Sequence, residues 1–82
     1  MGTKIRKVYL DRRYEVDLDG RYIGWVYKVN AHRWRAYVDD SISPEACREA
    51  RANRTTYAAT SDRHRTRKAA VDWLARTAPR YL

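Results

Sequence analysis

The chain has 82 residues, which fits one domain over residues 1–82 and leaves little room for a deep catalytic cleft. Its formal net charge is +8, with fourteen arginines to four lysines, and its three Trp, seven Tyr and 44% hydrophobic residues exclude a chain unable to fold. One cysteine and two histidines exclude an internal disulfide and any standard zinc spacing, and no apolar stretch approaches a membrane span or a signal peptide.

The first third of the chain predicts a β-hairpin. Residues 1–12 precede it as a flexible basic arm or, at Lys4–Leu10, as an edge strand. Residues 14–18 alternate apolar and acidic side chains, which is the period of a half-buried strand. Asp19-Gly20 is a preferred pair for a type I′ turn. Arg21–Val29 is rich in aromatic and β-branched residues, as the returning strand should be.

A third strand is predicted at Arg33–Val38, after a short turn at Asn30-Ala31. Its side chains alternate regularly between two faces. One face is suited to a core and carries Trp34, Ala36 and Val38. The other is suited to solvent or a ligand and carries Arg33, Arg35 and Tyr37.

A short helix is predicted at Pro44–Ala52. Ser43 is a favourable N-cap, and proline is well tolerated at the first helical position. Ile42 and Cys47 have the spacing of a hydrophobic staple across this helix start. The apolar face is small, so we expect a surface helix.

The last third predicts a strand and a longer helix. Thr55–Thr60 has the β-branched and aromatic residues of a fourth strand, and Ser61–Arg65 is a polar linker. Thr66 then caps a final helix at Arg67–Thr77. One face of that helix carries Ala70, Trp73, Leu74 and Thr77.

These elements predict an α+β fold, in which an antiparallel sheet of three to four strands packs on the C-terminal helix. The short extra helix is inserted before the last strand. Because one helix covers one face of the sheet, we expect the opposite face to be open to solvent or to a partner.

The sequence carries no recognisable catalytic motif, and we expect a protein that is not an enzyme. It lacks the nucleophile elbow, the phosphate-binding loop and the zinc-protease helix. Cys47 has no histidine near it in sequence, and both histidines lie beside arginine. We therefore expect no metal site and no cofactor.

Two basic features predict a polyanionic partner. Residues 63–68 place four formal positive charges at the N-terminal end of the last helix, where the helix dipole favours an anion. The polar face of the third strand could pair arginine with guanine, or its aromatic residues could stack on unpaired bases. A solvated polar surface is the alternative for both. The candidate nucleic-acid-binding residues are Arg33, Arg35, Tyr37, Arg54, Arg63, Arg65, Arg67 and Lys68.

Three segments resemble the AP2-like domains, which include the arm-type DNA-binding domains of phage integrases. They are Gly24–Lys28, Arg33–Val38 and Thr66–Leu74. The resemblance implies a three-stranded sheet on one C-terminal helix, with the outer sheet face in the DNA major groove. It would place Arg33, Arg35 and Tyr37 on the DNA. The segment 39–53 is a long insertion relative to that family. The Arg- and Ala-rich composition also resembles that of small actinobacterial phage proteins.

We therefore expect a small basic protein that binds nucleic acid, with DNA preferred over RNA and duplex DNA as the leading target. The first alternative is a phage-type accessory protein that binds a host protein through an acidic patch on that protein. The second is a homodimer paired through the edge strand at Lys4–Leu10. We expect no membrane partner, and a location in the cytoplasm, or in the host cytoplasm or nucleoid if the protein is phage-encoded.

Overall fold

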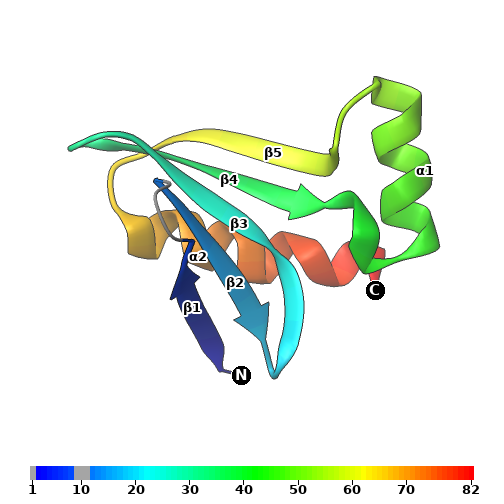
Figure 1. Cartoon of the computed structure of the whole chain (residues 1–82), viewed down its shortest axis with the longest axis horizontal. Coiled ribbons are helices and arrows are strands. Elements are labelled where there is room, and N and C mark those ends of the chain that lie inside the picture. The colour runs from blue at the N-terminus through cyan, green and yellow to red at the C-terminus, as the bar shows by residue number, and fades with distance from the viewer. Residues whose placement is uncertain (1, 9–11) are drawn as a thin grey trace.

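The computed structural model describes residues 2–8 and 12–82, which form an antiparallel sheet with one helix on a face and another at one end (Figure 1). The sheet has five strands, and their spatial order is their order in the chain. The strands are β1 (Thr3–Lys7), β2 (Arg13–Leu18), β3 (Arg21–Asn30), β4 (Arg33–Asp39) and β5 (Tyr57–His64). The α+β class is confirmed, but the sheet has five strands rather than the expected three to four.

The β2–β3 hairpin is confirmed with its predicted turn. Asp19 and Gly20 have φ values of 52° and 82°. Both are positive, as a type I′ turn requires, and this turn matches the twist of the two strands it joins. The register then pairs Leu18 with Arg21 directly across the turn.

The N-terminal segment is an edge strand rather than an arm. β1 pairs with β2 from Thr3 opposite Leu18 to Lys7 opposite Tyr14. Across this pair, the guanidinium of Arg6 donates to the carboxylate of Asp17 at 2.8 Å. Residues 9 and 10, the end of the expected strand, lie outside the described residues. β1 therefore supplies the fifth strand of the sheet.

The prediction of a polar linker at Ser61–Arg65 is wrong, because β5 continues through this segment to His64. Ser61 pairs with Ala36 and His64 pairs with Trp34 of β4. Backbone hydrogen bonds to β4 hold this polar sequence in the sheet without an apolar pattern. Arg63 has a φ of 68°, and the register shifts in this stretch, as at a bulge.

Both predicted helices are confirmed, together with their caps. The first, α1 (Pro44–Asn53), follows a 3₁₀ turn at Asp40–Ile42, and the Ser43 hydroxyl accepts from the Ala46 N–H at 3.0 Å. The second, α2 (Arg67–Thr77), begins where the Thr66 hydroxyl accepts from the Ala69 N–H at 3.1 Å. Among the described residues, no helix is long and apolar enough to cross a membrane.

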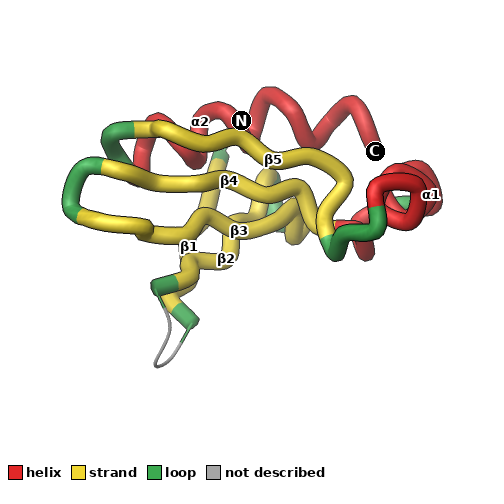
Figure 2. Tube along the Cα trace, turned by 90° about the horizontal axis from the view of Figure 1, so that it is seen from above, coloured by secondary structure: helices red, strands yellow, loops and turns green. Residues whose placement is uncertain are grey.

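The core lies between α2 and one face of the sheet. α2 packs against β3, β4 and β5, while α1 closes the end of the sheet beside β5 (Figure 2). The predicted inward set of β4 is confirmed, since Trp34, Ala36 and Val38 are all buried. On α2, Ala70 and Leu74 are buried as expected, and Val71 joins them. Within residues 2–8 and 12–82, no helix lies on the sheet face opposite α2.

Gly24 is required by a close approach between β3 and β4. It pairs with Val38 and has a φ of 156°. A Cβ atom built on Gly24 would lie 2.0 Å from the backbone oxygen of Tyr37. Only glycine lets the two strands pair here, which fixes the register of the side chains on the open face.

Candidate nucleic-acid interface

A row of four side chains crosses the open face from β2 to β5. The Arg13 guanidinium lies over the Trp25 ring, 4.3 Å from its centroid. The Trp25 and Tyr37 rings are stacked, with centroids 4.9 Å apart and an interplanar angle of 14°. Tyr57 meets Tyr37 edge to face at 5.0 Å. We call these four residues the outer row.

The outer row leaves Trp25 with no free ring face. β2 and β4 flank β3 on opposite sides, so the Arg13 guanidinium and the Tyr37 ring cover opposite faces of the indole. Rings packed in this way stand upright on the sheet and present their edges outward. Trp25 therefore offers its polar edge rather than an open π-face, beside the hydroxyl groups of Tyr37 and Tyr57 and the Arg13 guanidinium.

A second group on the open face is built around one carboxylate. Asp62 accepts two hydrogen bonds from Arg33, and the Nε atom of Arg35 lies 3.3 Å from the same carboxylate. The Arg33 guanidinium holds the pKa of the Asp62 carboxyl well below its usual range, and the Arg63 backbone N–H and Arg35 add to the effect. Because one negative charge meets two positive charges, the group keeps a net positive charge. We call these three residues the Asp62 group.

Tyr27 links the outer row to the Asp62 group. In the register, Tyr27 of β3 lies between Arg13 of β2 and Arg35 of β4. A shallow depression on this face is lined by Trp25, Tyr27, Arg35, Tyr37, Thr56 and Tyr57. Arginine and half-exposed aromatic side chains thus form one continuous surface over three strands.

Positive charge is concentrated at one end of the molecule. β2 and β4 begin at this end, β3 and β5 finish there, and α2 starts there (Figure 1). The described cations at this end are Lys7, Arg12, Arg13, Lys28, Arg33, Arg63, Arg65, Arg67 and Lys68. The opposite end also has cations, among them Arg21 and Arg54, but there the carboxylates of Asp19, Asp39, Asp40 and Glu45 offset them. The antiparallel path of the chain, rather than any single charge run, produces this polarity.

The structure separates the predicted site residues into three places. Arg33, Arg35 and Tyr37 are half-buried on the open face. Arg63 and Arg65 follow Asp62 in the chain, at the basic end of the molecule. Arg54 caps the C-terminal end of α1 and precedes the start of β5. The eight residues of β5, which span roughly 25 Å, separate Arg54 from the basic end. Arg54 is therefore at the far end of the sheet.

Arg67 and Lys68 occupy the third place. They begin α2, which packs on the sheet face opposite the open one. Arg67 and Lys68 of the basic cluster at 63–68 therefore lie on the α2 side of the sheet, apart from Arg33, Arg35 and Tyr37.

Four residues of the open face were not among the predicted site residues: Arg13, Trp25, Tyr27 and Tyr57. The alternation of side chains along β3 could have indicated Trp25 and Tyr27, because both flank the buried Val26 and so point to the opposite face. Asp62 was missed because its segment was expected to be a linker. Within the described part of the chain, no group of His, Cys, Asp or Glu side chains is placed to hold a metal ion.

No family model, curated protein or solved structure matches this chain. The AP2-like resemblance accordingly remains a prediction.

Proposed function

We propose that this protein binds nucleic acid, with duplex DNA as its target, through the open face of β3 and β4 and the basic end of β5. One observation supports this most directly. Arg13, Arg33 and Arg35 are interleaved with half-exposed aromatic side chains on a sheet face that no helix covers. Arginine provides forked donors for phosphate and for the guanine edge, and a net charge of +8 favours approach to a polyanion.

The outer row favours a duplex over unpaired bases. Single-strand binders need aromatic faces on which successive bases stack. Both faces of Trp25 are already occupied, by Arg13 and by Tyr37. Stacking a base there would first break these contacts, whereas upright ring edges and guanidinium groups suit a groove lined by phosphates and base edges.

The width of the surface also fits a duplex. The major groove is about 12 Å wide and admits a two-stranded β-ribbon, and neighbouring strands lie about 4.8 Å apart. The β3–β4 pair presents Tyr27 directly beside Arg35. Arg63, near the end of β5, and Arg65, just beyond that strand, lie at the same end and would contact the phosphate backbone.

The test compares a fluorescent duplex with a single strand of the same sequence, by anisotropy across a salt series. We expect binding to the duplex at about 50 mM salt, weakening steeply as salt rises because phosphate contacts release counterions. Single-strand binding should be weaker under the same conditions. Salt-independent binding, or none at low salt, would contradict the proposal.

A charge-matched pair of double variants locates the surface. Arg33→Gln with Arg35→Gln removes two cations from the open face, and Arg48→Gln with Arg51→Gln removes two exposed cations from α1. The first pair should weaken duplex binding at least about tenfold and the second less than about threefold. Equal losses would assign the binding to net charge alone. Thermal melting of each variant checks that it remains folded.

A further inference from the structure

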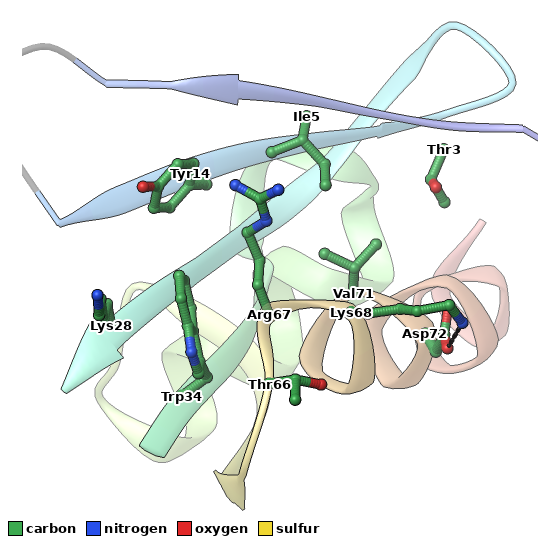
Figure 3. A pocket seen from close by; sticks show the side chains of 10 residues that line it. All are labelled: Thr3, Ile5, Tyr14, Lys28, Trp34, Thr66, Arg67, Lys68, Val71 and Asp72. Atoms are coloured by element: carbon green, nitrogen blue, oxygen red, sulfur yellow. Dashed lines mark hydrogen bonds and ion pairs between the residues drawn. The ribbon is translucent and has the colours of Figure 1, made fainter. Parts of the chain in front are cut away.

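A hollow lies on the opposite side of the sheet, between the start of α2 and the β1–β2 hairpin (Figure 3). α2 covers β3, β4 and β5, and the hairpin extends beyond it. The hollow has a volume of about 670 Å³, which is within the usual size of ligand pockets. We call it the α2 hollow.

The lining of the α2 hollow is part polar and part apolar, and its apolar and aromatic part comes from four elements. Ile5 of β1 and Val71 of α2 face each other across it, and Tyr14 of β2 and Trp34 of β4 form the wall beside them (Figure 3). Val71 and Trp34 are buried, while Ile5 and Tyr14 are half-buried. An apolar side chain entering here would remove the remaining exposed surface of these walls from water.

The rim of the α2 hollow is positively charged. The Arg67 side chain rises from α2 into the hollow, and its guanidinium lies 5.1 Å from the Tyr14 ring centroid (Figure 3). Lys28 stands on the same rim. Neither cation has an ion pair among the described residues. The rim carboxylate of Asp72 is already bound by Lys68 at 2.9 Å.

We propose that the α2 hollow docks a short acidic peptide segment of a partner protein, anchored by one large apolar side chain. The anchor packs against Ile5 and Val71 beside the Arg67 side chain, and flanking carboxylates pair with Arg67 and Lys28. A buried apolar anchor within a charged rim is the common arrangement of protein-recognition sites, in which arginine and aromatic residues contribute most. A nucleic-acid backbone satisfies the cations but leaves the apolar walls exposed, so the peptide is the better match.

The probe is a fluorescein-labelled synthetic peptide of aspartate and glutamate around one central phenylalanine. We expect it to bind at physiological ionic strength and to shift the methyl resonances of Ile5 and Val71. A control peptide with serine in place of phenylalanine should bind at least about tenfold more weakly, because the apolar anchor is lost. Equal binding of the two peptides, no binding, or shifts confined to the open face would each overturn the proposal.

Two charge-matched variants test the rim. Arg67→Glu should weaken peptide binding about tenfold by replacing attraction with repulsion, and it remains compatible with folding because an acidic residue favours a helix N-terminus. Arg80→Glu, an exposed site beyond α2, should change it less than about twofold. If both variants weaken binding equally, the peptide is attracted only by net charge and docking in the hollow is excluded.

The same variants separate this inference from the proposed function. The Arg33→Gln, Arg35→Gln double variant should bind the peptide as the parent does, and Arg67→Glu should bind duplex as Arg80→Glu does. A duplex bound to the open face should leave the peptide in place on the parent protein, because the two sites lie on opposite sides of the sheet. A duplex that competes through Arg67 would assign the hollow to nucleic acid and overturn the peptide proposal.

Discussion

Arg33 of β4 donates two hydrogen bonds to Asp62 of β5, and this ion pair joins residues 29 positions apart in the sequence. The same carboxylate also lies 3.3 Å from the Nε atom of Arg35. One acidic residue thus holds in place two of the five arginines that we assign to the nucleic-acid interface. It orients their guanidinium forks, and it also places a negative charge where phosphates would approach.

Asp62→Asn should therefore tighten duplex binding. The substitution removes a repulsive charge and releases Arg33 and Arg35 for phosphate contacts. Affinity at low salt should rise, and the slope of log affinity against log salt should steepen by about one. Anisotropy titrations over a salt series measure both quantities. Asp72→Asn, an equal charge change on α2, is the control and should have a smaller effect. Weaker binding by Asp62→Asn would show that orienting the arginines matters more than repulsion.

Gly24→Ala should destabilise the fold by at least about 2 kcal/mol. The added methyl group would collide with the Tyr37 backbone oxygen, and the backbone at Gly24 is in a conformation that favours glycine. Urea unfolding followed by circular dichroism measures the change. Gly2→Ala meets no atom within 4 Å and should stay within about 0.5 kcal/mol of the parent. Equal stability of Gly24→Ala and the parent would mean that β3 and β4 are paired differently.

The stacked rings of Trp25 and Tyr37 should show a favourable coupling energy. In a double-mutant cycle with leucine at both positions, we expect a coupling of about 1 kcal/mol in the free energy of unfolding. Trp25 and Tyr57 are on strands separated by β4 and touch only through Tyr37, so their cycle should show a smaller coupling than the stacked pair. A coupling as large for the second pair would contradict the order of the outer row.

Protonation of His64 should destabilise the fold at mildly acidic pH. Burial lowers the pKa of His64 below its usual 6.5; Asp62 opposes this shift and Arg76 adds to it. The unfolded chain then binds a proton at a pH where the folded chain does not, so stability falls as pH drops through 6.5 towards the folded pKa. Urea midpoints compared at about pH 7.5 and about pH 5.5 measure the loss. His64→Gln should reduce the loss of stability between these two pH values. An unchanged pH dependence in that variant would contradict a role for His64.

Local chemistry was sufficient to predict most elements. Asp19-Gly20 predicted a type I′ turn, and Ser43 and Thr66 predicted two helix starts, because each signal depends on residues adjacent in sequence. The alternation of residues 33–38 likewise identified the buried face of β4. These features are properties of a few consecutive residues, so no knowledge of distant segments was needed.

Other features depended on distant segments. β5 extends through Ser61–His64 because β4 supplies its hydrogen-bond partners, which a polar sequence does not reveal. The Arg33–Asp62 contact depends on that extension. Trp25 and Tyr37 stack only because the close approach at Gly24 sets the β3–β4 register.

The sequence by itself determined a strongly basic chain, its hairpin, its helices and the inward set of β4. Only the tertiary structure decided how the basic residues are distributed. An antiparallel order of strands gathers cations at one end, and the packing of α2 against one face then places Arg67 and Lys68 at the α2 hollow rather than beside Arg33 and Arg35. Charge is fixed by composition, but the surface to which a charge belongs depends on which segments pair and pack, and those contacts join residues far apart in the chain.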